Sequence, residues 1–168
     1  MHYVSWDRSD KQNLKLLAEA GPEVLGVFQH DRASVNGEIW DLTTSPESGA
    51  VASRGGEEIV RAHDPLRRGD QVRVDIEGRQ YIMVGETSKN WIIDDAYGNK
   101  VGQFTRENSG VRKAILEFEG ETDLPPTDVA GLAWISREIL EARQVASATP
   151  LIALLVLSSI VVVAVYLL

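Results

Sequence analysis

Cysteine is absent from the 168 residues of this chain, and basic residues are in the minority. Without cysteine the chain has no disulfide, no thiolate ligand for zinc or iron–sulfur clusters, and no palmitoylation site. Seventeen Lys and Arg residues against 25 Asp and Glu residues give a net charge of −8. A protein that binds nucleic acid needs a basic face to displace counterions from phosphates, so we exclude nucleic acid as a partner.

Recognisable catalytic motifs are also missing. The sequence has no phosphate-binding P-loop and no G-x-S-x-G nucleophile elbow. The adjacent pairs His30-Asp31 and His63-Asp64 contain residue types that bind metals. Neighbouring residues of a strand point to opposite faces, however, so neither pair converges on one ion. We therefore expect a non-enzymatic protein with no catalytic, cofactor-binding or metal-binding residues and no evident small-molecule substrate.

The N-terminus lacks the apolar run of a secretory signal peptide, because charged residues such as Asp7, Arg8 and Lys11 interrupt it. The pattern from 10 to 20 predicts a short helix that ends at Gly21-Pro22. We interpret residues 1–21 as an N-terminal helical segment. The domain that follows, residues 22–144, is expected to face the cytoplasm.

Charge is absent from residues 145–168, and thirteen of the last eighteen residues are Leu, Ile or Val. A helix over residues 150–168 would be about 28 Å long at ~1.5 Å per residue, close to the ~30 Å hydrocarbon core of a bilayer. We predict a linker at 145–149 and a transmembrane helix at 150–168, in a single-pass, tail-anchored protein of the inner or plasma membrane. Arg143 and Tyr166 would then lie at the two membrane interfaces. The alternative is a helix threaded through a β barrel.

Short β-like runs separated by turn sequences occupy most of residues 22–120. The clearest strand contains Val72, Val74 and Ile76, which alternate with polar residues. The segment WIIDDAYGNKVGQF, residues 91–104, predicts a hairpin with Gly98 in its turn. Because no long helices separate these runs, we expect a mainly β fold, an antiparallel meander or barrel.

A second helix is predicted at 127–144, after Pro125-Pro126, with Thr127 as its N-cap. It is amphipathic and packs on or into the sheet. Trp134 falls off its apolar stripe beside Arg137, so we take both as candidate partner contacts, since exposed Trp is enriched at binding hot spots. A Trp134 ring at the lipid headgroup level is an equally good interpretation. Ser158 and Ser159 are further candidate partner contacts, unless each hydroxyl bonds its own helix.

This order of elements resembles the tubby C-terminal-like superfamily, which includes LURP-one-related proteins and phospholipid scramblases. The resemblance covers residues 24–144 and implies a β barrel closed around a mostly apolar helix, here 127–144. Tubby proteins bind phosphoinositides through basic side chains, and scramblases are palmitoylated on cysteine. This acidic, cysteine-free domain departs from both. The candidate anionic-lipid contacts are the pairs Arg67-Arg68 and Arg112-Lys113.

Two functions fit these observations. The favoured one is a non-enzymatic, tail-anchored protein whose cytoplasmic β domain is an accessory or assembly subunit of a larger membrane protein complex. The alternative is a lipid-binding or scramblase-like protein at the membrane surface. The expected partners are the lipid bilayer and an integral membrane protein complex.

Overall fold

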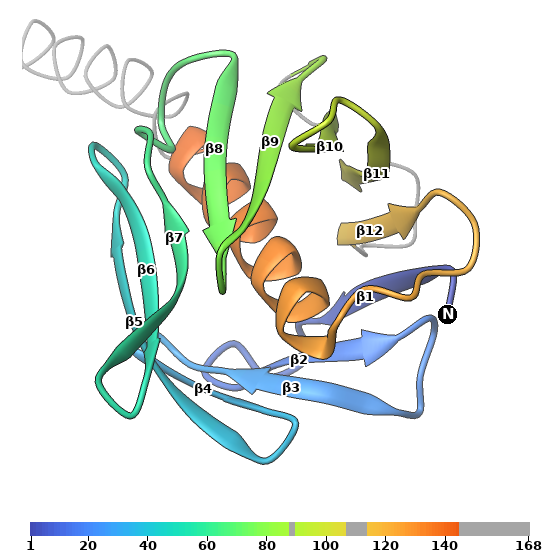
Figure 1. The fold of residues 1–168 in the computed structure, drawn as a ribbon. Helices are drawn as coiled ribbons and strands as arrows, with labels where there is room; N and C mark the ends of the chain where they lie inside the picture. The colour runs from blue at the N-terminus through green and yellow to red at the C-terminus, as the bar shows by residue number, and fades with distance from the viewer. Residues whose placement is uncertain (88–89, 107–113, 145–168) are drawn as a thin grey trace, which may run out of the picture.

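Twelve antiparallel strands form a closed barrel in a computed structural model that describes residues 1–87, 90–106 and 114–144. Each strand pairs with the next along the chain, and the last pairs with the first, Val4 lying opposite Leu116. One helix, residues 126–144, runs through the middle of the barrel (Figure 1). The strands are β1 (Tyr3–Asp7), β2 (Leu14–Ala18), β3 (Val24–Phe28), β4 (Arg32–Val35), β5 (Glu38–Ser45), β6 (Gly49–Arg54), β7 (Glu57–Ala62), β8 (Gln71–Ile76), β9 (Arg79–Gly85), β10 (Asn90–Asp95), β11 (Lys100–Arg106) and β12 (Ala114–Phe118).

Alternation along the strands decides which side chains face the helix. On β8, Val72, Val74 and Ile76 are fully buried, whereas Gln71 and Arg73 are exposed. Residues of a strand point alternately to its two faces, so one face of each strand contributes to the core and the other to the surface. Closure of the sheet leaves no free edge among the described strands.

The helix is the centre of the hydrophobic core. Every residue from 128 to 137 is buried, so burial surrounds the helix and is not confined to one stripe. A helix that is buried on all sides has to be mostly apolar and has to include small residues where strands come close. Gly131 is such a place, because an added Cβ would lie 3.0 Å from side-chain atoms of Val60 and Ile76.

The predicted N-terminal helix is wrong, and strands β1 and β2 occupy residues 1–21 instead. The Asp10 carboxylate accepts hydrogen bonds from the backbone N–H groups of Gln12 and Asn13, at 2.9 and 3.3 Å, and so forms a turn before β2. Strand β2 then pairs with both β1 and β3. Residues 1–21 are therefore part of the barrel and not a separate segment.

The prediction of a single-pass, tail-anchored architecture is corrected as well. Within the described ranges, no helix combines the length and apolar character needed to cross a bilayer. The helix that the structure shows, 126–144, is enclosed by strands and is not a membrane span. The predicted linker 145–149 and span 150–168, with Ser158, Ser159 and Tyr166, lie outside the described residues.

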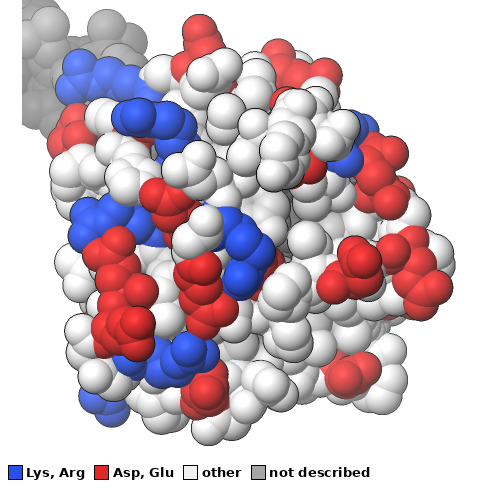
Figure 2. Space-filling view, viewed as in Figure 1, with Lys and Arg blue, Asp and Glu red and all other residues white. Residues whose placement is uncertain are grey.

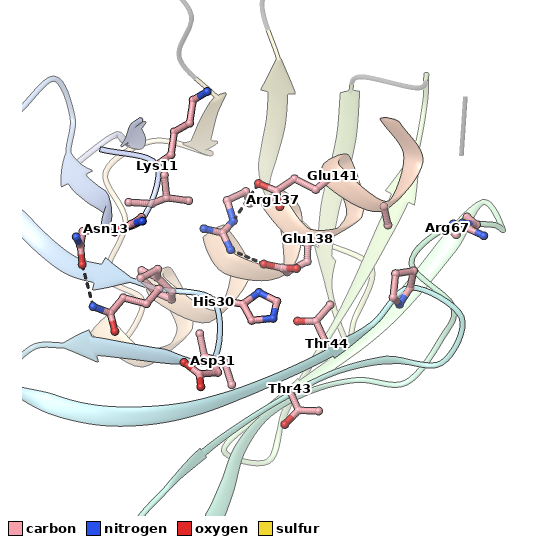
Figure 3. Close-up of a pocket in the computed structure, with 17 residues that line it drawn as sticks. Lys11, Asn13, His30, Asp31, Thr43, Thr44, Arg67, Arg137, Glu138 and Glu141 are labelled. Atoms are coloured by element: carbon pink, nitrogen blue, oxygen red, sulfur yellow. Dashed lines mark hydrogen bonds and ion pairs between the residues drawn. The ribbon is translucent and has the colours of Figure 1, made fainter. Parts of the chain in front are cut away.

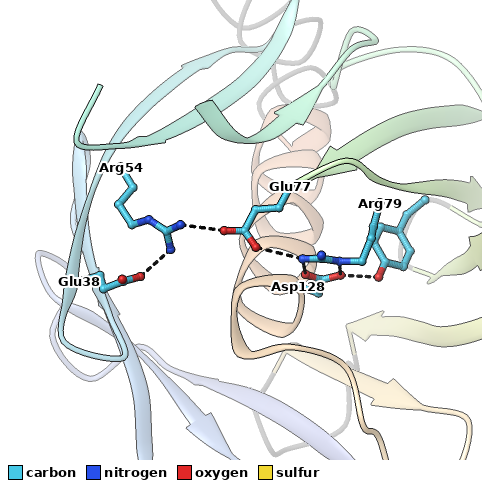
Figure 4. Close-up of polar contacts among 6 residues, drawn as sticks. Glu38, Arg54, Glu77, Arg79 and Asp128 are labelled. Carbon is cyan, nitrogen blue, oxygen red and sulfur yellow. Dashed lines mark hydrogen bonds and ion pairs between the residues drawn. The ribbon is translucent and has the colours of Figure 1, made fainter. Parts of the chain in front are cut away.

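A buried carboxylate fixes the first turn of the helix to the barrel wall. Asp128, which is completely buried, accepts hydrogen bonds from Arg79 Nε at 2.7 Å, Arg79 Nη2 at 2.6 Å and the Tyr81 hydroxyl at 2.5 Å. Glu77 bridges Arg79 to Arg54, at 3.1 and 2.9 Å (Figure 4). The hydrogen bond to Asp128 raises the pKa of the Arg79 guanidinium above its ordinary value. These contacts hold the helix in a fixed axial position.

Candidate functional site

An open pocket of about 900 Å³ lies beside the C-terminal half of the helix. Its walls come from four parts of the chain: the turn before β2, the β3–β4 turn, strand β5 with the residues after it, and the helix. Figure 3 shows the helix side chains opposite the β3–β4 turn. The lining residues are 11–14, 28–31, 42–44, Pro46, Arg67, Arg137, Glu138, Glu141 and Ala142.

The pocket walls are tied to one another by hydrogen bonds. The Gln29 amide donates to Asn13 Oδ1 at 2.8 Å and links the β3–β4 turn to the turn before β2. The backbone N–H of Leu42 donates to the carbonyl of Asp31 at 2.8 Å, which fixes that turn against β5. The backbone N–H of Arg67 donates to the Pro46 carbonyl at 3.0 Å. These contacts give the pocket a preformed shape.

Arg137 is the most deeply buried charged side chain of the pocket, at 7% exposed. Its guanidinium carbon lies 5.1 Å from the centre of the Trp6 ring, within the range of a cation–π contact. Nη2 donates to Glu138, and Nε lies 3.7 Å from a Glu141 carboxylate oxygen. Nη1 and Nε are buried and make no hydrogen bond to any described residue.

Outside the pocket, the charges of the surface are mostly paired with opposite charges. Figure 2 shows acidic and basic side chains side by side over the strands β5 to β8. Arg73 donates to Asp64 at 3.0 and 2.8 Å, and these hydrogen bonds lower the pKa of the Asp64 carboxyl. His63 Nε2 lies 2.6 Å from Asp75 Oδ2. Paired surface charges of this kind contribute little to stability and do not mark a site.

Trp134 was predicted to be exposed, and this prediction is wrong. Its side chain is 1% exposed because the barrel surrounds the helix and leaves no outer face for it. It therefore cannot contact a partner in this structure. Arg137, predicted beside it, is also buried, but it lines the open pocket.

The predicted lipid and interface residues have partners within the protein. Arg67 and Arg68 both bind Glu47, at 2.7 and 3.1 Å. Arg143 donates to the Gly69 carbonyl and lies 4.3 Å from the centre of the Trp91 ring. Burial lowers the pKa of the Arg143 guanidinium. Arg112 and Lys113 lie outside the described residues.

Reasoning from the sequence missed the pocket, including Lys11, Gln29, His30, Thr44 and Glu141. These residues are far apart in the sequence and form no local motif, so no pattern in the sequence brings them together. Among the described residues, no group of three or more His, Cys, Asp or Glu side chains is placed to hold a metal ion.

Comparisons with known protein families, curated proteins and solved structures found no match for this chain. Its functional interpretation therefore rests on the geometry of the pocket. That pocket offers hydrogen-bond donors, a buried cation and apolar side chains such as Phe28 and Leu42 in one open space. This combination is suited to binding another molecule.

Proposed function

We propose that this protein is a non-enzymatic accessory domain that docks onto another protein through the open pocket beside its central helix. The observation that carries the proposal is the buried Arg137 in the wall of this pocket, with two N–H groups that lack a hydrogen-bond partner in the described structure. Buried polar groups in folded proteins are almost always paired. An unpaired donor beside an open pocket favours a bound partner that supplies the acceptor.

The composition of the pocket supports a polypeptide as the bound molecule. Polar lining residues such as Gln12, His30 and Thr44 alternate with apolar ones such as Leu14 and Leu42. A polypeptide presents backbone hydrogen-bonding groups and apolar side chains within the same few ångströms, and interfaces commonly combine both. A larger membrane protein complex as the partner, and a cytoplasmic location, stay predictions.

The experiment that tests this proposal introduces a bulky charge into the pocket. Thr44 is exposed on β5 and points into the pocket near His30 (Figure 3), so Thr44→Arg should fill part of the space without disturbing the core. Ser34→Arg places the same side chain at an exposed position of β4 that does not line the pocket. Purification of the full chain from its native cells should give a stable partner with the wild type and Ser34→Arg and lose it with Thr44→Arg. Retention of the partner by Thr44→Arg contradicts the proposal.

The lipid-binding alternative and the tubby-like resemblance also stay proposals. The closed barrel around an apolar helix supports the resemblance. The pairing of Arg67 and Arg68 with Glu47 weakens the case for a lipid contact there. Co-sedimentation with anionic vesicles tests the alternative: lipid binding through this pair predicts that changing both arginines to glutamine reduces the bound fraction.

A further inference from the structure

The guanidinium of Arg137 lacks an acceptor on the side that faces the pocket. Trp6 covers one face of this group, and Glu138 accepts from Nη2. The Glu141 carboxylate, at 3.7 Å from Nε, is too distant for a hydrogen bond. Figure 3 shows the guanidinium directed into the pocket above His30. A buried N–H without an acceptor is unfavourable, so the missing acceptor is expected to come from a bound molecule.

Charge complementarity excludes an anion as the source of that acceptor. The pocket lining carries three basic residues, Lys11, Arg67 and Arg137, and three acidic ones, Asp31, Glu138 and Glu141, so its charges cancel. The chain as a whole has a net charge of −8. A carboxylate or phosphate near Nη1 would also lie near the Glu138 and Glu141 carboxylates and be repelled by them.

A cation does not satisfy this site either, because Arg137 offers donors and a cation has no acceptor to give. Glu138 and Glu141 already interact with Arg137. The remaining possibility is an uncharged acceptor such as an amide carbonyl. The apolar lining residues, Leu14 and Leu42 among them, favour an apolar group next to that carbonyl.

We infer that the pocket binds an uncharged stretch of a partner polypeptide, in which a backbone carbonyl accepts a hydrogen bond from Arg137 Nη1. An apolar side chain of the same stretch packs against Leu14 and Leu42. This inference rests on the proposed function and adds the chemistry of the bound segment. It also implies that binding depends little on salt, since neutral groups are not screened as charges are.

Three small probes of one scaffold test the inference: N-acetyl-leucine N-methylamide, N-acetyl-leucine and leucine N-methylamide. They share an apolar side chain and differ in being neutral, anionic and cationic. Each is titrated into the full chain while the NMR signals of the Arg137 Nε–H and the Trp6 indole N–H are followed. The neutral probe should shift both signals and bind at least about fivefold more tightly than the other two, the factor expected for one ordinary hydrogen bond.

Two variants show whether the shifts come from this site. Arg137→Lys keeps the positive charge but loses Nη1, so the Trp6 signal should stop responding to the neutral probe. Arg143→Lys is the matched control, because Arg143 also lies over an indole ring, that of Trp91, and does not line the pocket. Thr44→Arg blocks the pocket with Arg137 unchanged, and it should abolish the response even if Arg137→Lys fails to fold.

Equal or tighter binding of the anionic probe overturns the inference. So does a complete lack of response, which would show that water alone satisfies Arg137. Neither result touches the proposed function, which stands or falls with the loss of the native partner from Thr44→Arg. A response to the neutral probe together with partner retention by Thr44→Arg would separate the two in the other direction.

Discussion

Arg79 holds the carboxylate of Asp128 through two hydrogen bonds, from Nε at 2.7 Å and from Nη2 at 2.6 Å. The pair joins β9 to the first turn of the central helix across 49 residues of sequence. Its two members differ in environment, because the Asp128 side chain is fully buried and the Arg79 side chain is 41% exposed. This asymmetry decides what each substitution does to stability.

Removal of Arg79 should cost more stability than removal of Asp128. Arg79→Met leaves a buried carboxylate without its cation, which destabilises by about 3–5 kcal/mol. Asp128→Asn leaves a guanidinium that can turn toward water and a weakened bond to Tyr81, at a cost of about 1–3 kcal/mol. Urea unfolding of both variants measures the difference. Arg73→Met, which breaks the exposed pair with Asp64, is the control and should cost less than ~1 kcal/mol. Equal losses for the first two variants contradict the burial argument.

Stability should also fall at alkaline pH because of Tyr81. Burial, and then the hydrogen bond to Asp128, raise the pKa of the Tyr81 phenol above its ordinary value. The protonated phenol is therefore favoured in the folded state. Its contribution is fully present below about pH 10, the pKa of an unfolded tyrosine, and is lost as pH rises from there toward the folded pKa.

The measurement is the free energy of unfolding at about pH 8 and at about pH 11, on either side of that unfolded pKa. It should fall more between these values in the wild type than in Tyr81→Phe. Tyr97→Phe is the control, because Tyr97 is 91% exposed and should leave the pH dependence as it is in the wild type. Identical slopes for wild type and Tyr81→Phe would show that this phenol is not coupled to folding.

Gly131 should tolerate little added volume. An alanine Cβ would lie 3.0 Å from Val60 and Ile76 side-chain atoms, and the larger Gly131→Val would overpack the core by a further two methyl groups. We expect Gly131→Val to destabilise by about 1–3 kcal/mol or more. Combining Gly131→Ala with Val60→Ala should make room, so that in the Val60→Ala background Gly131→Ala stabilises by up to ~1 kcal/mol through helix propensity. Thermal melts of the four proteins check both expectations.

The barrel should fold without the apolar C-terminal run. The helix that fills the barrel is described to residue 144, and its buried side chains end at Ala142. A chain that ends at residue 149 should therefore keep a β-rich circular dichroism spectrum and a single cooperative melt. A molten or insoluble product would show that residues 150–168 are needed for the core.

Local patterns in the sequence predict many of the strands, because alternation is a property of neighbouring residues. Val72, Val74 and Ile76 lie on β8, and the segment around Gly98 forms the turn between β10 and β11. The same local reasoning fails at 14–18, where Leu, Lys and Ala favour a helix in isolation. There β2 is held by pairing with β1 and β3, and long-range contacts outweigh intrinsic propensity.

The burial of Trp134 and the existence of the pocket depend on closure of the barrel, which no local pattern shows. An amphipathic stripe on the helix suggested that one face was exposed, but closure buries the opposite side too. The pocket likewise joins residues as distant as Asn13 and Arg137. What the sequence does contain is an Arg on an otherwise apolar helix, and that feature identified Arg137 although not its surroundings.

Photo-crosslinking from inside the pocket tests the central claim most directly. A benzoyl-phenylalanine at position 44 of the full chain, irradiated in cells that make the protein naturally, should crosslink to a distinct polypeptide. The same group at position 34, exposed but outside the pocket, should not. A crosslinked protein from position 44 alone is the result that the docking pocket predicts. Crosslinks from position 34 alone, or from both positions equally, would contradict it.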